Sequence, residues 1–228
     1  MAEKTEELLA ELEVETVFRI GGIGISESVV VSWVLMAALM LLVFIFTRNL
    51  KVHNISKRQA ALETFVNFIQ NLTSGFVGKE GGSFVPYLST VLIFIGFANI
   101  AGVFGFKPPT KDVNVTASLA IMSIILIEAA SIRRKGPVGF LKSFAHPTPV
   151  MVPINLMELV TRPLSLCMRL FGNVLGAFVI MKLVEILLFP LGLPPIFGLY
   201  FDFFDGFIQA YIFVFLTGQF IREAIEIH

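Results

Sequence analysis

Seven ionisable residues lie inside two otherwise apolar stretches in the last third of the chain. These residues are Glu158, Arg162, Arg169, Lys182, Glu185, Asp202 and Asp205. A charged side chain near the bilayer centre costs about 2.5–3.5 kcal/mol on insertion scales, so such residues usually face protein or a water-filled cavity. Charges kept in this setting are typical of an ion path through a membrane.

The first four polar positions are spaced to share one face of a helix. Glu158 and Arg162 form an i,i+4 pair with the acid first, which is the favourable order. Arg169 follows seven residues later, and Asn173 follows four residues after that. No acid stands four residues from Arg169 on either side, so this charge lacks a neutralising partner within its own helix.

The remaining acids form a second patch. Glu185 comes 16 residues after Arg169, about 160° around an ideal helix, and so faces the opposite way. Asp202, Asp205 and Gln209 share a stripe in the last stretch by steps of three and four. Two patches separated by a mid-membrane arginine would suit two half-channels, although Glu185 and Asp205 are equally compatible with ordinary acids at the outer interface.

Other charges also have a plain structural interpretation. Glu158 and Arg162 would form a salt bridge near the cytoplasmic interface, and Glu128 would pair with the basic cluster that follows it. Lys182 would extend its ammonium group to the interface. His53 and His146 fall in predicted loops, and we expect neither to bind a metal.

The composition requires a membrane around these residues. Charged residues make up only 15% and hydrophobic residues 56%, whereas soluble domains carry about 25% charged residues. The formal net charge of zero argues against a nucleic-acid-binding protein, which needs a basic surface. A single cysteine excludes a disulfide framework and a cysteine-based zinc site.

Five apolar stretches are long enough to cross the bilayer, which takes roughly 20 helical residues. They are 29–47, 84–106, 113–132, 153–189 and 195–221. Lipid offers no partner to free backbone groups, so all five should be helices. The last two exceed the hydrocarbon thickness and must tilt steeply. We therefore predict an all-α integral membrane protein whose last two helices form a long, strongly tilted hairpin.

The segment 55–76 predicts a sixth helix of a different kind. Its apolar stripe is interleaved with polar residues, and Ser56 and Gln59 have the spacing of a capping box. We expect an amphipathic helix lying on the membrane surface. The alternative is a helix packed on a partner's soluble domain.

Basic residues predict the orientation. Most Lys and Arg outside the spans lie in the loops 48–83 and 133–152 and at the C-terminus, which places these parts in the cytoplasm and the N-terminus outside. We expect one membrane domain over 1–228, with an acidic external tail at 1–28 and membrane helices over 29–225. The tail lacks the basic and apolar regions of a signal peptide, and a bacterial plasma membrane is the expected location.

Four motifs now carry a family resemblance. The sequence PLSLCMRLFGN at 163–173 resembles the signature helix of subunit a of F-type ATP synthases, and GFIQAYIF at 206–213 resembles its last helix. PTKDVNVT at 109–116 is similar to that family's loop before its next helix, and PINLME at 153–158 is similar to its run into the signature helix. The motifs keep the family's order.

The resemblance implies a non-catalytic stator of the Fo motor. Its partners would be a rotating ring of c subunits, the b subunits of the peripheral stalk, the lipid bilayer and the transported H⁺ or Na⁺. Arg169 matches the family's essential arginine, which faces the ring's carboxylates. Asn173 and Gln209 match polar residues near that contact, and Glu158 matches an acid of the cytoplasmic-side path. No cofactor or nucleotide site is implied, and the chain has no P-loop.

The chain also departs from the family pattern. Nine residues after the arginine many members carry Glu, and this chain has Phe178; seven residues before the glutamine some members carry His, and this chain has Asp202. We predict that the entrance carboxylate has moved to Asp202, assisted by Glu185 or Asp205. Further half-channel candidates are Glu128 and Asp112.

Two other functions fit fewer of these observations. A secondary transporter would commonly show internal repeats with paired broken helices, and the sequence shows no repeat. An intramembrane hydrolase would need a serine–histidine, paired-aspartate or zinc constellation, and no histidine lies in a predicted span.

Overall fold

The computed structural model describes most of the chain, from the end of the acidic tail to the end of the last helix. The described residues are 16–20, 23–48, 50–51, 55–104, 108–144, 149–188 and 198–226. The acidic residues predicted to form an external tail lie largely at 1–15, outside this part, as do His53 and His146. Residues at the end of the predicted tail instead form an antiparallel hairpin of β1 (Thr16–Ile20) and β2 (Ile23–Ser26).

Helices make up nearly all of the rest. The α-helices are α2 (Glu27–Thr47), α3 (Lys57–Val77), α4 (Val85–Ile100), α5 (Val113–Ser143), α6 (Val152–Leu188) and α8 (Gly206–Ile225). The short 3₁₀ segments are η1 (Lys79–Phe84), η2 (Ala101–Phe104), η3 (Pro109–Lys111) and η4 (Pro149–Met151), and η6 (Leu199–Asp205) is a π-helix. Five helical segments are long and apolar enough to cross a membrane, which confirms the predicted all-α membrane fold.

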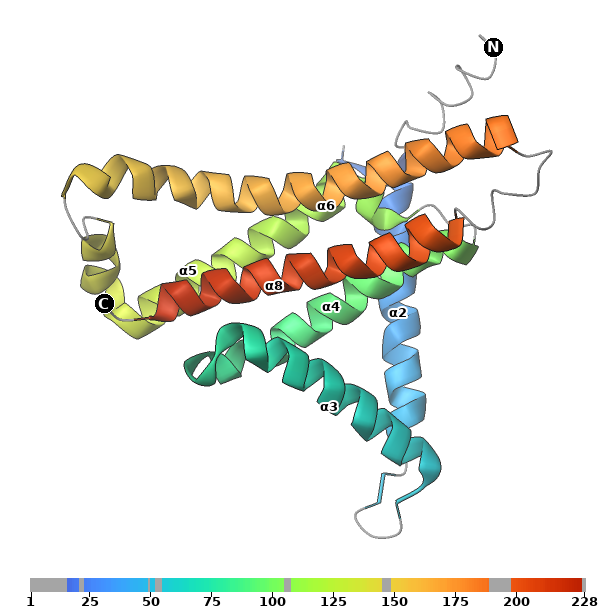
Figure 1. Ribbon diagram of the computed structural model, residues 1–228, viewed down its shortest axis with the longest axis horizontal. Coiled ribbons are helices and arrows are strands. Elements are labelled where there is room, and N and C mark those ends of the chain that lie inside the picture. Colours follow the sequence, from blue (N-terminus) through green and yellow to red (C-terminus); the bar gives the residue numbers. More distant parts are fainter. Residues whose placement is uncertain are drawn as a thin grey trace.

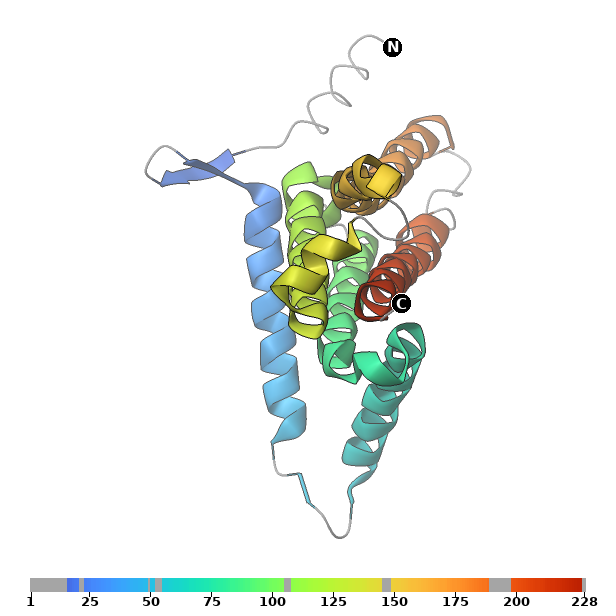
Figure 2. The ribbon, with the colours of Figure 1, turned by 90° about the vertical axis from the view of Figure 1, so that its left-hand side faces the viewer.

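Helix α2 stands apart from the other helices. Figures 1 and 2 show it running upright beside the remaining helices, and only 6% of its most apolar window is buried inside the protein. Uncharged side chains cover all sides of it from Ser28 to Thr47. This composition suits a helix surrounded by lipid.

Helix α3 is the predicted amphipathic helix, and it is not among the five candidate spans. The Ser56 hydroxyl accepts a hydrogen bond from the Gln59 amide, 3.3 Å away, as the capping-box spacing predicts. The Gln59 side chain does not return to Ser56; it bonds both backbone groups of Lys51 and the Glu63 carboxylate. The cap therefore ties the start of α3 to the segment that follows α2.

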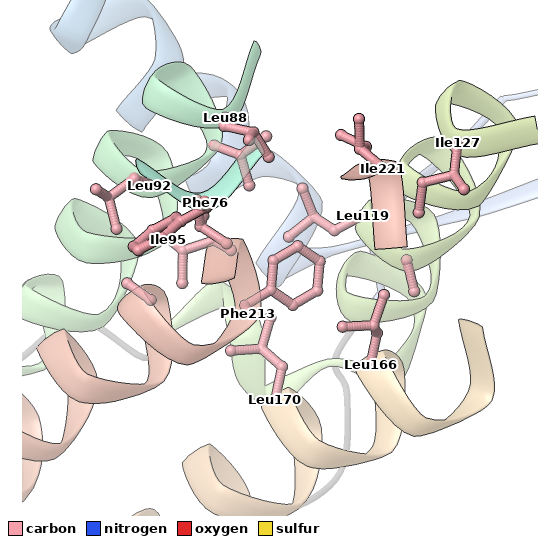
Figure 3. Close-up of a cluster of buried hydrophobic side chains, with 14 of the residues drawn as sticks. Phe76, Leu88, Leu92, Ile95, Leu119, Ile127, Leu166, Leu170, Phe213 and Ile221 are labelled. Carbon is pink, nitrogen blue, oxygen red and sulfur yellow. The ribbon is translucent and has the colours of Figure 1, made fainter. Parts of the chain in front are cut away.

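The core lies where α4, α5, α6 and α8 meet. Its fully buried side chains include Leu88, Ile95, Ile127, Leu170 and Ile221, and Figure 3 shows Phe213 of α8 within this cluster. The start of α8 approaches α4 closely, because a Cβ atom on Gly206 would lie 2.7 Å from the Asn99 Cβ. Small residues allow such backbone approach in membrane helices.

Helix α8 also packs on the end of α3. The Phe76 ring meets the rings of Tyr211 and Phe215 edge to face, at 5.4 and 5.3 Å between centroids. A Cβ atom on Gly218 would lie 2.7 Å from the Phe76 Cβ. The amphipathic helix is thus fixed to the last helix through its C-terminal turn.

The long helices differ in their course. Helix α5 continues past the predicted end at residue 132 and bends at Gly136, whose φ is 73° and which Pro137 follows. Helix α6 runs without interruption through Pro163. In Figure 1, α6 and α8 lie side by side and at a steep angle to α2, which is the predicted tilted hairpin.

Candidate ion-translocation site

Arg169 lies at the middle of α6 on its outer face. Its side chain is exposed, whereas the adjacent Leu166 and Leu170 are 2% and 1% exposed and point into the core. Within the described part of the chain, Arg169 makes no hydrogen bond or ion pair. A guanidinium in the middle of a membrane helix needs a counter-charge, and the described residues do not supply one.

Exposed residues that are small or polar lie near Arg169 on α6. Ser165, Gly172 and Asn173 are exposed beside it, and a Cβ atom added to Gly172 would meet nothing within 4 Å. Small residues of this kind allow the backbone of a second membrane helix to approach closely. Asn173 is thus exposed one helical turn from Arg169.

Gln209 differs from Asn173 in its surroundings. Its side chain is 7% exposed, on the face of α8 that also buries Ala210 and Phe213. No hydrogen-bond partner of Gln209 is present among the residues that the structure describes. Gln209 is thus a buried side-chain amide whose hydrogen-bonding groups are not used by the described residues, and such a group is costly to leave unpaired.

A large cavity lies at one end of the molecule, between α5, α6 and α8. Its volume is approximately 610 Å³, and its wall includes Glu128, Lys135, Glu158, Arg162 and Glu223. We call this end the basic end, because α5 carries the Arg133–Lys135 cluster there. Polar groups from three helices line the cavity, so water can enter it.

Arg162 is the centre of an ion triad in this wall. Its Nη2 atom lies 2.5 Å from the Glu158 carboxylate and 2.8 Å from that of Glu223 on α8. The ring of Phe220 lies 5.0 Å from the guanidinium carbon. The Glu158–Arg162 salt bridge predicted from spacing is present, and Glu223 is a second partner that no spacing within α6 could indicate.

A small cavity lies at the opposite end, beside Phe178. Its volume is approximately 20 Å³, which holds about one water, and its wall includes Asn99, Asp205 and Gly206. The ammonium group of Lys111, a residue only 6% exposed, lies 4.4 Å from the centre of the Phe178 ring. Where many family members carry Glu, this chain therefore holds an aromatic ring against a buried cation.

Three further predicted residues lie near this end. Asp112 is 1% exposed and accepts hydrogen bonds from the Ser26 hydroxyl and the Asn114 amide, at 2.8 and 2.9 Å. It caps α5 and joins it to the β-hairpin. The backbones of Glu185 and Asp202 belong to α6 and η6, and their side chains lie outside the described part.

The match to known proteins spans nearly the whole chain. Residues 29–222 match the ATP synthase A chain family. The chain belongs to this family. It is 36% identical to ATP synthase subunit a of Moorella thermoacetica over 93% of this chain and 96% of that one. It is 37% identical to ATP synthase subunit a 2 of a Bradyrhizobium species, covering 91% and 92%, and 31% identical to ATP synthase subunit a 1 of Crocosphaera subtropica, covering 90% and 89%.

Membership in the ATP synthase A chain family makes this chain a multi-span component of the membrane Fo sector. It confirms the resemblance carried by the motifs at 163–173 and 206–213. This membership associates the chain with ATP synthesis and with ion transport, and its transmembrane helices agree with it.

The ATP synthase A chain motifs did not reveal every polar contact of the site. Asn99, 3% exposed, donates to the Gly206 carbonyl at 3.0 Å and accepts from the Thr110 hydroxyl at 2.6 Å. The contact joins α4, η3 and the start of α8. The sequence does show an asparagine inside the apolar stretch 84–106, which indicates a buried polar contact. It does not show the partners, which belong to other segments of the chain.

Proposed function

We propose that this chain is the stator subunit of a rotary ion motor. It holds two half-channels for H⁺ or Na⁺ against a rotating ring of carboxylate-bearing c subunits, and ATP is made elsewhere in the complex. The exposed, mid-helix guanidinium of Arg169, which has no partner among the described residues, is the observation that carries this proposal.

The electrostatics of Arg169 explain why ion flow turns the ring. A ring carboxylate must be neutral, protonated or ion-bound, while it faces lipid, because a bare charge there is prohibitive. Arg169 favours the ionised carboxylate by Coulomb attraction, so the ion leaves into one half-channel before another binds from the second. The guanidinium itself stays protonated and cannot carry a proton across.

The two cavities lie on opposite sides of Arg169 along α6. On α6, Arg162 borders the large cavity and Val174 the small one, so at 1.5 Å per residue Arg169 lies about 10 Å along the helix from the first and about 8 Å from the second. This order supports two half-channels that stop short of each other, with the arginine between them.

The remaining assignments complete the proposal. The basic end faces the cytoplasm because basic loops stay on that side of a membrane, and the β-hairpin faces outward. The b subunits of a peripheral stalk are further partners, and a bacterial plasma membrane is the location. We assign the external entrance to Asp202, with Glu185 or Asp205 assisting, since Phe178 replaces the family's carboxylate.

The test is an Arg169→Ala complex, purified and reconstituted in liposomes. We expect the complex to assemble, to lose ion-driven ATP synthesis and to leak ions passively, because no fixed charge then separates the half-channels. Arg169→Lys should also lose most synthesis, since an ammonium group lacks the planar fork of guanidinium. Lys182→Gln, on the same helix, is the matched control and should retain most synthesis.

The outcome that refutes the stator mechanism is an assembled Arg169→Ala complex that makes ATP at a substantial fraction of the wild-type rate. A structural role for Arg169 would instead prevent assembly. Copurification of an oligomeric c ring with the chain also separates the stator from a transporter or a hydrolase, neither of which needs such a ring.

A further inference from the structure

The large cavity brings together three carboxylates from three helices. Glu128 comes from α5, Glu158 from α6 and Glu223 from α8. An ion that crosses this end of the protein needs a group that binds it and then releases it to water. The three carboxylates differ in whether they are already held in an ion pair.

Two of the three are already paired with the same cation. Glu158 and Glu223 both lie within 2.8 Å of the Arg162 guanidinium, whose side chain is only 18% exposed. Arginine is not deprotonated in proteins, so each of these acids permanently faces a positive charge. A carboxylate held in this way must break its ion pair before it can bind another cation, which makes it a poor carrier.

Glu128 is the third carboxylate, and its position is different. It is half-buried on α5 and lines the cavity, and among the described residues it has neither a hydrogen bond nor an ion pair. The basic cluster that could have neutralised it is partly engaged, because Arg134 bonds Glu80 at 2.8 Å.

The charged groups facing Glu128 come from all sides of the cavity. Arg162 of α6 and Lys135 of its own helix interact with it electrostatically. The carboxylates of Glu158 and Glu223 offset the positive charge of Arg162. Lys142 and the Glu80-paired Arg134 also line the cavity, so its basic residues outnumber its acids. This positive charge favours the release of a cation that has bound to Glu128 into the water of the cavity.

We propose that Glu128 is the ion-exchanging carboxylate of the basic-end half-channel, while Glu158, Arg162 and Glu223 form a fixed wall that ties α6 to α8. This inference rests on the proposed function. It reassigns the role that the family resemblance gave to Glu158. In each cycle the ionised Glu128 binds one H⁺ or Na⁺ and releases it to a neighbouring water or group, returning to its ionised form.

The experiment compares variants of the whole complex in liposomes. Glu128→Gln should slow ion-driven ATP synthesis at least tenfold, and Glu128→Asp should stay within threefold of wild type, because it keeps the carboxylate. Glu158→Gln should lose less than threefold. Glu226→Gln is the matched control, because Glu226 and its partner Arg222 both lie outside the cavity wall.

A second readout separates ion exchange from a structural role. The dependence of the synthesis rate on pH at the basic end should shift in Glu128→Asp and stay unchanged in Glu226→Gln. If the Glu128→Gln complex does not assemble, the pH profile of Glu128→Asp decides the question. A shifted profile supports the proposal, and an unchanged profile overturns it.

Wild-type synthesis by Glu128→Gln overturns the inference, as does a larger loss in Glu158→Gln than in Glu128→Gln. Neither result touches the stator mechanism, provided that Arg169→Ala is inactive in the same preparation. Activity in both Arg169→Ala and Glu128→Gln would instead remove the proposed function itself.

Discussion

Replacing Asn99 with leucine should destabilise the protein through two lost hydrogen bonds at the junction of α4, η3 and α8. Leucine has nearly the same size, so the change removes polar atoms and creates little cavity. The Thr110 hydroxyl, which is 0% exposed, then loses the acceptor that lies 2.6 Å away. The Gly206 carbonyl loses the donor at 3.0 Å.

The size of the effect follows from these contacts. Interhelical hydrogen bonds in membrane proteins contribute about 0.6 kcal/mol on average and about 1.7 at most. Two of them give roughly 1–3 kcal/mol, and the orphaned hydroxyl of Thr110 adds about 1 kcal/mol or more. We therefore expect Asn99→Leu to lower the free energy of unfolding by about 2–4 kcal/mol.

The chain provides its own probe for the assay. Cys167 is the single cysteine and is 8% exposed, so a thiol-reactive dye labels it only when the helices separate. The full chain is titrated with SDS in detergent micelles, and dye fluorescence reports the unfolded fraction. Asn67→Leu, at an exposed position of α3, is the control and should change stability by less than about 0.5 kcal/mol.

A double-mutant cycle tests the reasoning behind this value. Thr110→Val removes the orphaned hydroxyl, so adding it to Asn99→Leu should restore about 1 kcal/mol. The explanation fails if the two changes add independently, or if Asn99→Leu is as stable as Asn67→Leu.

Two further predictions concern packing and the external entrance. Gly218→Ala should destabilise the chain by about 1–3 kcal/mol, because its Cβ would lie 2.7 Å from that of Phe76. Gly75→Ala should instead stabilise α3 by up to about 1 kcal/mol, because the added Cβ meets no atom within 4 Å. Equal SDS midpoints for Cys167 labelling in the two variants would contradict this. Asp202→Asn should slow ion-driven synthesis in liposomes more than Glu185→Gln does, since Asp202 occupies a family entrance position, and full activity in the double variant would remove both residues from the path.

The helices of this fold could be predicted because their signals are local. Hydropathy alone located all five spans, and α6 (Val152–Leu188) nearly coincides with the predicted 153–189. The Ser56 cap followed from residues three positions apart. Arg169 was identified both by its missing intrahelical partner and by its motif.

The contacts between helices could not be predicted from such signals. Arg162 pairs with Glu223 across 61 positions, and Asn99 reaches Gly206 across 107. In both cases the partner lies on another helix, so the periodic pattern of a single helix cannot reveal it. The sequence did predict a polar face at 158–173, but not that a second helix would close the triad.

Asp202 and Asp205 show a second reason why the sequence was not sufficient, which is that it did not reveal the type of helix. Asp202 and Asp205 were placed on one stripe by α-helical spacing, yet both belong to the π-helix η6 (Leu199–Asp205). A π-helix bonds i to i+5 and turns less per residue than an α-helix. The stripe from Asp202 to Gln209 was inferred from α-helical spacing, which η6 does not have, and it stays a prediction.

The isolation of α2 has a consequence for how the protein is made. This helix precedes the other described helices in the chain, and only 6% of its apolar window depends on them for burial. It can therefore enter the bilayer during translation as an independent helix, stabilised by lipid before any bundle exists. Insertion of α2 would then fix the topology of every later helix, and the Ser26–Asp112 hydrogen bond would attach α2 to the assembled bundle only after α5 has followed.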